Sequence, residues 1–240
     1  MLHVTDGESV AGTLRESGVP GEVVVFGDLM YDGSMSVGMP PGPLVQFTEH
    51  DETVLWFDHS LSNQLMLIRA LDWFSEQDLR SRKLRLIMAG RVTLGGLHRE
   101  ELAALLPSRV PVTAEHFAVA RAAWRACATA DRPGIREIVE AGTPALPFLA
   151  PALRRYLEDV TEPGTLSRTE RQALTVLKEK GPLAPLRLFF MVQKMEESPF
   201  MGDTSFYRLL DGMAGLPDPL IRFDAATSMA EITRAGQASL

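Results

Sequence analysis

The stretch VLWFDHSLSNQL, residues 54–65, decides the fold. It opens with an unbroken apolar run, which predicts a strand buried on both faces, as in a parallel sheet. The polar pair Asp58-His59 ends that run. Apolar side chains then recur at helical spacing from about Ser62 to Ser75, and a second apolar run, Leu84 to Met88, follows. This order of strand, helix and strand is typical of an α/β domain.

The first 26 residues carry the same order of elements. Leu2 to Thr5 and Val23 to Phe26 are β-type runs, and Ser9 to Ser17 between them has the spacing of a helix. Two strand–helix–strand units predict a small, Rossmann-like parallel sheet, which we assign to an N-terminal α/β domain of residues 1–98.

A long connection, Asp28 to Asp51, joins the two units. It contains three glycines and three prolines and has no clear periodicity. Connections of this length are uncommon inside compact domains. We therefore expect a functional loop over the site, with a short hidden element as the alternative.

From Arg99 onward the pattern is helical, and we divide it into an all-helical segment, residues 99–160, and a C-terminal module, residues 161–240. In the helical segment we expect helices over 100–106, 113–129, 132–141 and 146–160. In the module, Ser167 and Glu170 form a capping box, and we expect helices over 167–180, 185–195 and 203–213 and a hairpin over 219–233. Three helices and a hairpin predict a winged-helix-like module.

Composition and charge narrow the class of protein. The chain has 240 residues, of which 45% are hydrophobic, and a formal charge of −7. This is typical of a globular protein, and the charge argues against nucleic acid or an anionic membrane as a partner. The single cysteine, Cys127, excludes an internal disulfide. We find neither a targeting segment nor an apolar run of about 20 residues, so we expect a soluble, cytoplasmic protein.

Seven short motifs occur in order along the chain: HVTDGESVAGTLR at 3–15, FGDLMYDG at 26–33, LWFDHSLSNQL at 55–65, LGGLHREEL at 94–102, LPFLAPALRRYLE at 146–158, LSRTERQAL at 166–174 and FMGDTSF at 200–206. With these motifs the chain resembles, over most of its length, a bacterial family known as domain of unknown function 1835. Members usually carry Asp at the position of Glu8 and a His-Glu-Gly-Pro run where Tyr31-Asp32-Gly33-Ser34 stands. The resemblance implies the domain layout, and the family label carries no activity.

Three polar clusters follow strands of the expected sheet, and open parallel sheets bind ligands at the carboxyl ends of their strands. The clusters are Asp6-Gly7-Glu8-Ser9, then Asp28, then Asp58-His59 with Asn63-Gln64. In the first cluster, glycine allows close approach of a ligand, and N–H groups at a helix start favour an anion. The alternative is that Asp6 or Ser9 only caps the helix.

The second and third clusters are candidates for acid–base chemistry. Imidazole titrates near neutral pH, so His59 is the candidate base, oriented by Asp28 or Asp58. Because adjacent strand residues face opposite sides of a sheet, we expect His59 to meet Asp6 or Asp28. The alternatives are a turn-forming Asp28 and a structural histidine.

Other chemistry has weaker support. The sequence has no Walker loop and no G-x-G-x-x-G fingerprint, so neither ATP nor NAD is indicated and no cofactor is assigned. The acids and His59 are the residue types of an oxygen-rich metal site, but no ligand spacing favours one, and we predict none. Ser9 lacks a G-x-S-x-G elbow, and Cys127 is expected to be a small buried residue.

These observations predict a protein that binds a small polar ligand at the strand ends, with acid–base or hydrolytic chemistry if it is an enzyme. One alternative is an effector-sensing transcriptional regulator that contacts DNA through the C-terminal module. Against it, the third helix of that module has Arg208 as its only base, and the hairpin adds Arg222. A non-enzymatic assembly component, with a protein partner or as a homodimer, is the third interpretation.

Overall fold

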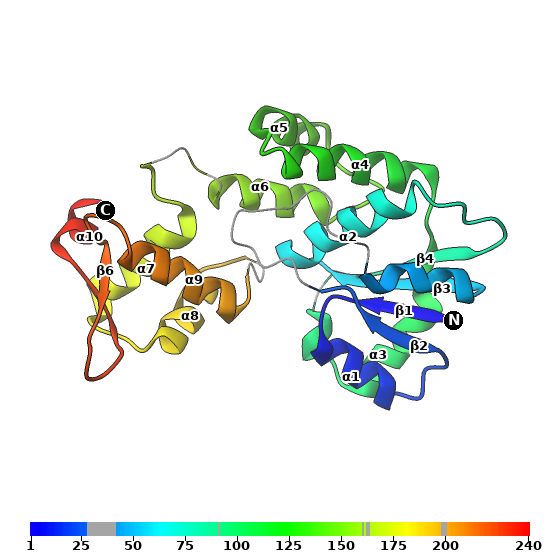
Figure 1. The fold of residues 1–240 in the computed structure, drawn as a ribbon, viewed down its shortest axis with the longest axis horizontal. Coiled ribbons are helices and arrows are strands. Elements are labelled where there is room, and N and C mark those ends of the chain that lie inside the picture. The colour runs from blue at the N-terminus through cyan, green and yellow to red at the C-terminus, as the bar shows by residue number, and fades with distance from the viewer. Residues whose placement is uncertain (28–41, 91, 160, 162–163, 198–200) are drawn as a thin grey trace. The chain divides into compact units, whose positions relative to one another are not determined.

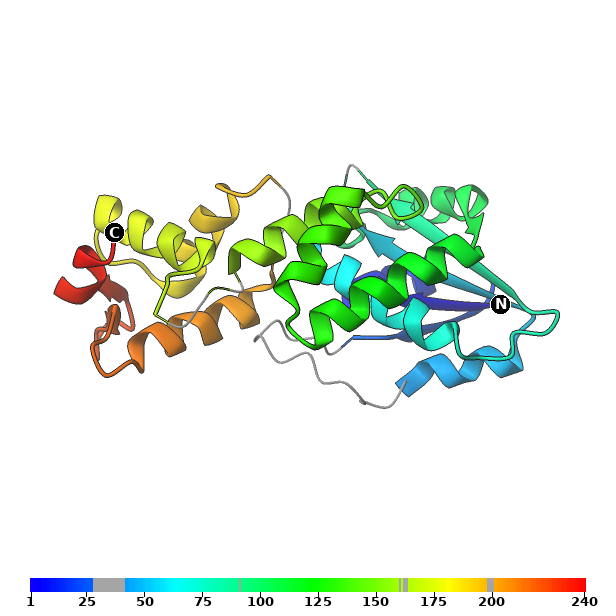
Figure 2. The same cartoon turned by 90° about the horizontal axis from the view of Figure 1, so that it is seen from above.

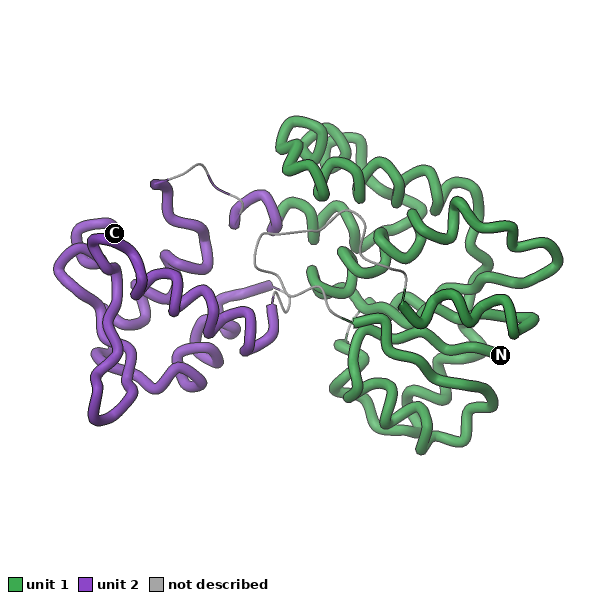
Figure 3. The backbone as a smooth tube through the Cα atoms, in the orientation of Figure 1, with its two compact units in different colours: residues 1–29, 35–154 green, residues 30–34, 155–240 purple. Residues whose placement is uncertain are grey.

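The computed structural model describes residues 1–27, 42–90, 92–159, 161, 164–197 and 201–240. The described chain forms two compact units, coloured in Figure 3: unit 1 ends at Arg154, and unit 2 begins at Arg155. The sequence suggested three segments. By their contacts, the helices that follow the sheet as far as Arg154 belong to the same compact unit as the sheet.

Unit 1 is built on a five-stranded sheet with the order β2-β1-β3-β4-β5. Its strands are β1 (Leu2–Thr5), β2 (Glu22–Val25), β3 (Glu52–Asp58), β4 (Lys83–Ala89) and β5 (Val110–Pro111). Strands β1 to β4 are parallel, as predicted. Strand β5 pairs antiparallel with β4, so the sheet is mixed. The prediction missed β5 because two residues are too short for a periodic pattern.

Helices cover both faces of the sheet. Helix α1 (Glu8–Glu16) connects β1 to β2, and α2 (Leu61–Phe74) connects β3 to β4. From β1 the chain moves to one side and from β3 to the other, so the strand order reverses between β1 and β3. In Figure 1, α1 and α3 (Arg99–Leu105) lie on one face, and α2 and α4 (Ala114–Ala128) lie on the other. Figure 2 shows α4 in front of the strands. This is the arrangement of a doubly wound sheet.

The core of unit 1 explains why its strands are unbroken apolar runs. Trp56 and Phe57 of β3 are fully buried. Helix α2 packs against both β3 and α4, and Leu67, Ile68 and Leu71 are completely buried. Parallel strands with helices on each side need apolar side chains toward both faces. The parallel strands β1 to β4, with helices on both faces, confirm the predicted N-terminal α/β sheet.

The long predicted loop contains one element in its second part. This is η1 (Gly42–Glu49), a 3-10 helix, so the expectation of a loop throughout is wrong there. The ring of Phe47 meets Trp73 and Phe74 edge to face, with centroids 5.7 and 5.5 Å apart, so tertiary packing holds a segment without clear periodicity. Asp28 lies outside the described residues.

The remaining elements of unit 1 are short 3-10 helices and a helical layer. They are η2 (Leu94–Gly96), η3 (Leu106–Ser108), α5 (Arg132–Ala141) and the first part of α6 (Leu149–Asp159). Helix α5 packs against α4. The expected helices after the sheet are thus present, with α6 starting three residues later than predicted, after a turn that contains Pro147.

Unit 2 consists of helices and one hairpin. After the end of α6 come α7 (Arg168–Lys180), α8 (Pro185–Gln193), α9 (Asp203–Ala214), β6 (Ile221–Phe223), β7 (Ala230–Ile232) and α10 (Arg234–Ala238). The predicted capping box is confirmed: the Glu170 N–H donates to Ser167 Oγ, and the Ser167 N–H donates to the Glu170 carboxylate. An isolated β-bridge joins Leu183, between α7 and α8, to Ala230. None of the described helices combines the length and apolar composition that spanning a membrane requires.

Candidate functional site

Asp6 and Asn63 join the two halves of the sheet where the strand order reverses. Asp6 follows β1, and Asn63 lies in the first turn of α2, which follows β3. The Asn63 side-chain amide donates to Oδ2 of Asp6 at 2.7 Å. Burial raises the pKa of Asp6, and the charge of Asp58 raises it further, while the hydrogen bond from Asn63 offsets part of this rise.

The structure rejects helix capping as the role of Asp6 and Ser9. The N-cap residue of α1 is Gly7, in an extended conformation, and no side chain among the described residues caps the helix. The Asp6 carboxylate accepts from Asn63 instead, and the exposed Glu8 carboxylate accepts from Arg15 at 3.0 Å. The first N–H groups of a helix have no intrahelical acceptor. Because Glu8 and Ser9 are exposed, the start of α1 is open to water.

Asp58 anchors the backbone at the end of β3. Its Oδ1 accepts from the N–H of Ser60 and its Oδ2 from the N–H of Leu94, both at 2.9 Å. The Gln64 side chain donates to the Asp58 carbonyl at 2.6 Å, and the Asp58 N–H donates to Oδ1 of Asn63 at 3.2 Å. Asp58, Asn63 and Gln64 are all buried. These bonds hold the starts of α2 and η2 against the strand, and they engage both carboxylate oxygens of Asp58.

His59 is partly buried, and its Nδ1 has no hydrogen-bond partner among the described residues. Its ring packs edge to face on Phe148, with ring centroids 6.3 Å apart. The predicted pairing of His59 with Asp6 is therefore absent in the part of the chain that the structure describes, and Asp28 lies outside it. Buried polar atoms without a partner are uncommon in proteins, so this nitrogen is a candidate ligand contact.

The sequence patterns missed three further residues beside this cluster. Phe148 contacts His59 and also lies against Gly90, after β4, where any Cβ would overlap its ring. Gly95 of η2 lies beside Ser9, whose hydroxyl would be 3.8 Å from a Cβ at that glycine. The two glycines were available as a signal, because glycine often marks close approach of backbone to another group. The position of Phe148 depends on packing over a long sequence separation and left no local signal.

The structure thus gathers most of the predicted residues at one edge. Asp6, Asp58, Asn63 and Gln64 form one bonded cluster, with His59 next in sequence and Gly7 at the open start of α1. Among the described residues, no three His, Cys, Asp or Glu side chains are arranged as a metal site requires. Cys127 is buried, which raises the pKa of its thiol to about 12, so it is a structural residue and not a nucleophile.

No protein-family model matches this chain, and no curated protein matches it. The resemblance to the domain of unknown function 1835 family therefore stays a prediction from the motifs, and the function rests on the geometry of the strand ends.

Proposed function

We propose that unit 1 binds a small polar ligand at the carboxyl ends of β1 and β3. The observation that carries this proposal is the bond between Asp6 and Asn63, which crosses the point where the strand order reverses. In doubly wound sheets the loops of the two halves separate at this point and leave room for a ligand. A partly buried carboxyl group with a raised pKa at such an edge favours a functional role.

The groups at this edge define the chemistry of the ligand. The Asp6 carboxyl group accepts hydrogen bonds when ionised and donates one when protonated. The start of α1 offers backbone N–H donors, and Ser9 offers an exposed hydroxyl. A ligand with hydroxyl or carbonyl oxygens satisfies these groups. The charges of Asp6 and Glu8 oppose a ligand with several negative charges.

For an enzyme, these residues favour acid–base chemistry, hydrolysis included. His59 is the proposed base, because its Nδ1 has no partner among the described residues. Asp6 is the proposed acid, because its raised pKa keeps the proton to a higher pH than an ordinary carboxyl group does. Asp58 is left out of this role, because backbone N–H groups bind both of its oxygens. Asp28, which lies outside the described residues, stays the proposed partner that orients His59.

A thermal-shift screen with hydroxylated and phosphorylated metabolites tests this proposal. A compound that raises the melting temperature of the wild-type protein should lose that effect in Asp6→Asn and in His59→Gln. The matched control is Glu16→Gln, which removes a charge at the exposed far end of α1 and should keep the wild-type response. Equal responses in all four proteins would remove Asp6 and His59 from the site.

A second candidate function, a regulator that contacts DNA through unit 2, has one observation in its favour. The bridge between Leu183 and Ala230 ties the α7–α8 connection to the hairpin, which supports a winged-helix layout. The charge opposes it, because α9 carries Arg208 against Asp203 and Asp211. A mobility-shift assay at two salt concentrations decides: no shift at the lower concentration excludes this function.

A further inference from the structure

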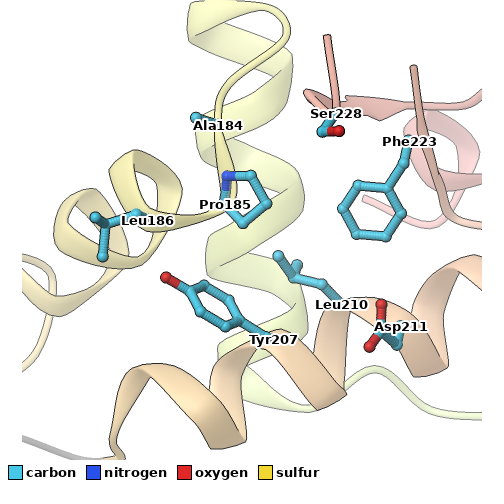
Figure 4. Close-up of a pocket in the computed structure, with 8 residues that line it drawn as sticks. All are labelled: Ala184, Pro185, Leu186, Tyr207, Leu210, Asp211, Phe223 and Ser228. Carbon is cyan, nitrogen blue, oxygen red and sulfur yellow. The ribbon is translucent and has the colours of Figure 1, made fainter. Parts of the chain in front are cut away.

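Unit 2 has a groove between the start of α8, the middle of α9 and the β6–β7 hairpin (Figure 4). Its volume is about 490 Å³, within the range of sites that bind drug-sized molecules. The proposed site at the strand ends of unit 1 uses none of the residues that line this groove. The groove is therefore a candidate for a separate binding site.

The lining of the groove is mainly apolar. Pro185 and Leu186 come from α8, Tyr207 and Leu210 from α9, and Phe223 from the hairpin. In Figure 4 the Phe223 ring faces Leu210, and the Tyr207 ring reaches toward Leu186. Leu186 is 48% exposed and Phe223 is 37% exposed, so this apolar surface meets water. A flat apolar molecule that covers it would be stabilised by the removal of this surface from water.

The groove carries a negative charge that no cationic side chain among the described residues neutralises. Among its described lining residues, Asp211 alone is charged. In the described chain, Asp211 makes no ion pair, not even with Arg208 on the same helix face three residues earlier. Arg222, on the hairpin, donates twice to the Glu231 carboxylate, at 2.9 and 3.1 Å, so it is already engaged. The groove therefore favours a cation over an anion.

We propose that this groove binds a small organic cation with a flat apolar body. The body covers Leu210 and the rings of Tyr207 and Phe223. The cationic group lies beside Asp211 and over one ring face, where the carboxylate and the ring quadrupole attract it together.

Titration of the full chain with 1-naphthylmethylammonium, followed by calorimetry, tests the proposal. This cation should bind more tightly than 1-naphthoate, an anion of similar size, and than the neutral 1-naphthylmethanol. Asp211→Asn should weaken binding of the cation about fivefold, which corresponds to one partly exposed ion pair, and leave the alcohol unaffected. The control Asp218→Asn removes the same charge from an exposed position outside the groove lining and should change none of the three affinities.

A second variant separates the apolar contact from the charge. Phe223→Ser should weaken binding of both the cation and the neutral alcohol, because both place the same ring system on Phe223. Equal binding of the three probes, equal effects of the two aspartate variants, or no binding of the cation up to its solubility limit would overturn the proposal. A wild-type dimer that Phe223→Ser dissociates in sedimentation experiments would also overturn it, because a second copy would then fill the groove.

Discussion

His3 in unit 1 and Arg155 in unit 2 are both buried polar side chains, and the two units satisfy them by different means. His3 is completely buried; its Nδ1 accepts from the Trp56 indole at 3.0 Å, and its Nε2 lies 3.2 Å from the Pro20 carbonyl oxygen. A neutral imidazole with its proton on Nε2 satisfies both contacts. At His3, unit 1 thus buries a polar group without burying a charge.

Arg155 instead lies in a network of charges. It donates to both carboxylate oxygens of Glu196, each at 2.8 Å, to Asp159 at 2.9 Å and to Thr169 at 2.8 Å. Burial opposes its charge, but the Glu196 and Asp159 carboxylates hold the pKa of Arg155 above its ordinary value. A buried ion pair adds little net stability to the folded state, yet removal of one of its two partners strongly destabilises the protein. The comparison therefore predicts that unit 2 is sensitive to loss of a charge and unit 1 to protonation.

Arg155→Met should have the largest effect. The substitution leaves the Asp159 and Glu196 carboxylates, whose side chains are 3% and 2% exposed, without the Arg155 guanidinium. The loss of one partner of a buried ion pair costs about 3–5 kcal/mol, a large part of the stability of a small domain. Urea unfolding followed by far-UV circular dichroism measures this loss, and hydrogen exchange should locate it in unit 2.

Two controls accompany this variant. Arg154→Met replaces the exposed neighbour and should change the free energy of unfolding by less than about 0.5 kcal/mol. The three tryptophans, at positions 56, 73 and 124, all belong to unit 1. Tryptophan fluorescence should therefore stay native at urea concentrations that unfold unit 2 of Arg155→Met. Simultaneous loss of both signals would contradict the difference between the units.

Trp56→Phe should have the next largest effect, and it acts in unit 1. It keeps a ring in the core but removes the N–H that donates to Nδ1 of His3. A buried acceptor without its donor costs about 1–3 kcal/mol, and the smaller ring adds a packing loss. Urea unfolding, followed by the fluorescence of the other tryptophans, measures this loss of stability. Trp73→Phe is the matched control, and an equal loss there would show that ring size and not the His3 contact decides.

Acid should weaken unit 1 before unit 2. Burial lowers the pKa of His3 in the folded state, while the pKa of this histidine in the unfolded chain stays at about 6.5. Below that pH the unfolded state binds more protons than the folded state, so the stabilisation present at neutral pH is lost as the pH falls. For one histidine the slope does not exceed about 1.4 kcal/mol per pH unit. Burial lowers the pKa of His116 as well, so it acts in the same direction.

Hydrogen exchange at about pH 7.5 and about pH 5.5 measures this effect, since His titrates between these values. The five histidines, at positions 3, 50, 59, 98 and 116, all belong to unit 1. Amides of unit 1 should lose protection at the lower pH, and those of unit 2 should not. The same loss in both units would mean that carboxylates, and not buried histidines, set the response to acid.

The parts of unit 1 that the sequence predicted share one physical cause. Strands β3 and β4 and helix α2 are buried on both faces or nearly all round, and such burial leaves an apolar pattern that can be read locally. The gathering of Asp6, Asp58 and Asn63 followed from the same pattern, because the carboxyl ends of parallel strands meet at one edge.

The parts that the sequence did not predict depend on contacts between distant residues. An aspartate before a helix can cap it or reach another element, and the local sequence is the same in both cases. Only the position of β1 beside β3 lets Asp6 reach Asn63. Phe148 lies beside His59 for a similar reason: it comes from the segment before α6.

Asp6→Asn should have the smallest effect, and its sign separates Asp6 from Asp58. Because the folded state raises the pKa of Asp6, the unfolded chain loses that proton first, and the ionised carboxylate lowers stability at neutral pH. Asparagine removes the charge and keeps an acceptor for Asn63, so the free energy of unfolding at pH 7 should rise by less than about 1 kcal/mol. Such a gain is typical of functional sites, where residues needed for binding lower the stability of the fold. The gain should vanish below about pH 3, where the unfolded chain also holds the proton.

Asp58→Asn gives the opposite expectation and completes the test. Two backbone N–H groups need the two oxygens of Asp58, and an amide supplies only one oxygen, so this variant should lose about 1–3 kcal/mol. Urea unfolding at pH 7 measures both variants, with mass spectrometry to exclude deamidation of the Asn-Gly sequence that Asp6→Asn creates. If both variants lose stability alike, Asp6 is an anchor like Asp58, and the edge between β1 and β3 is built for the fold and not for a ligand.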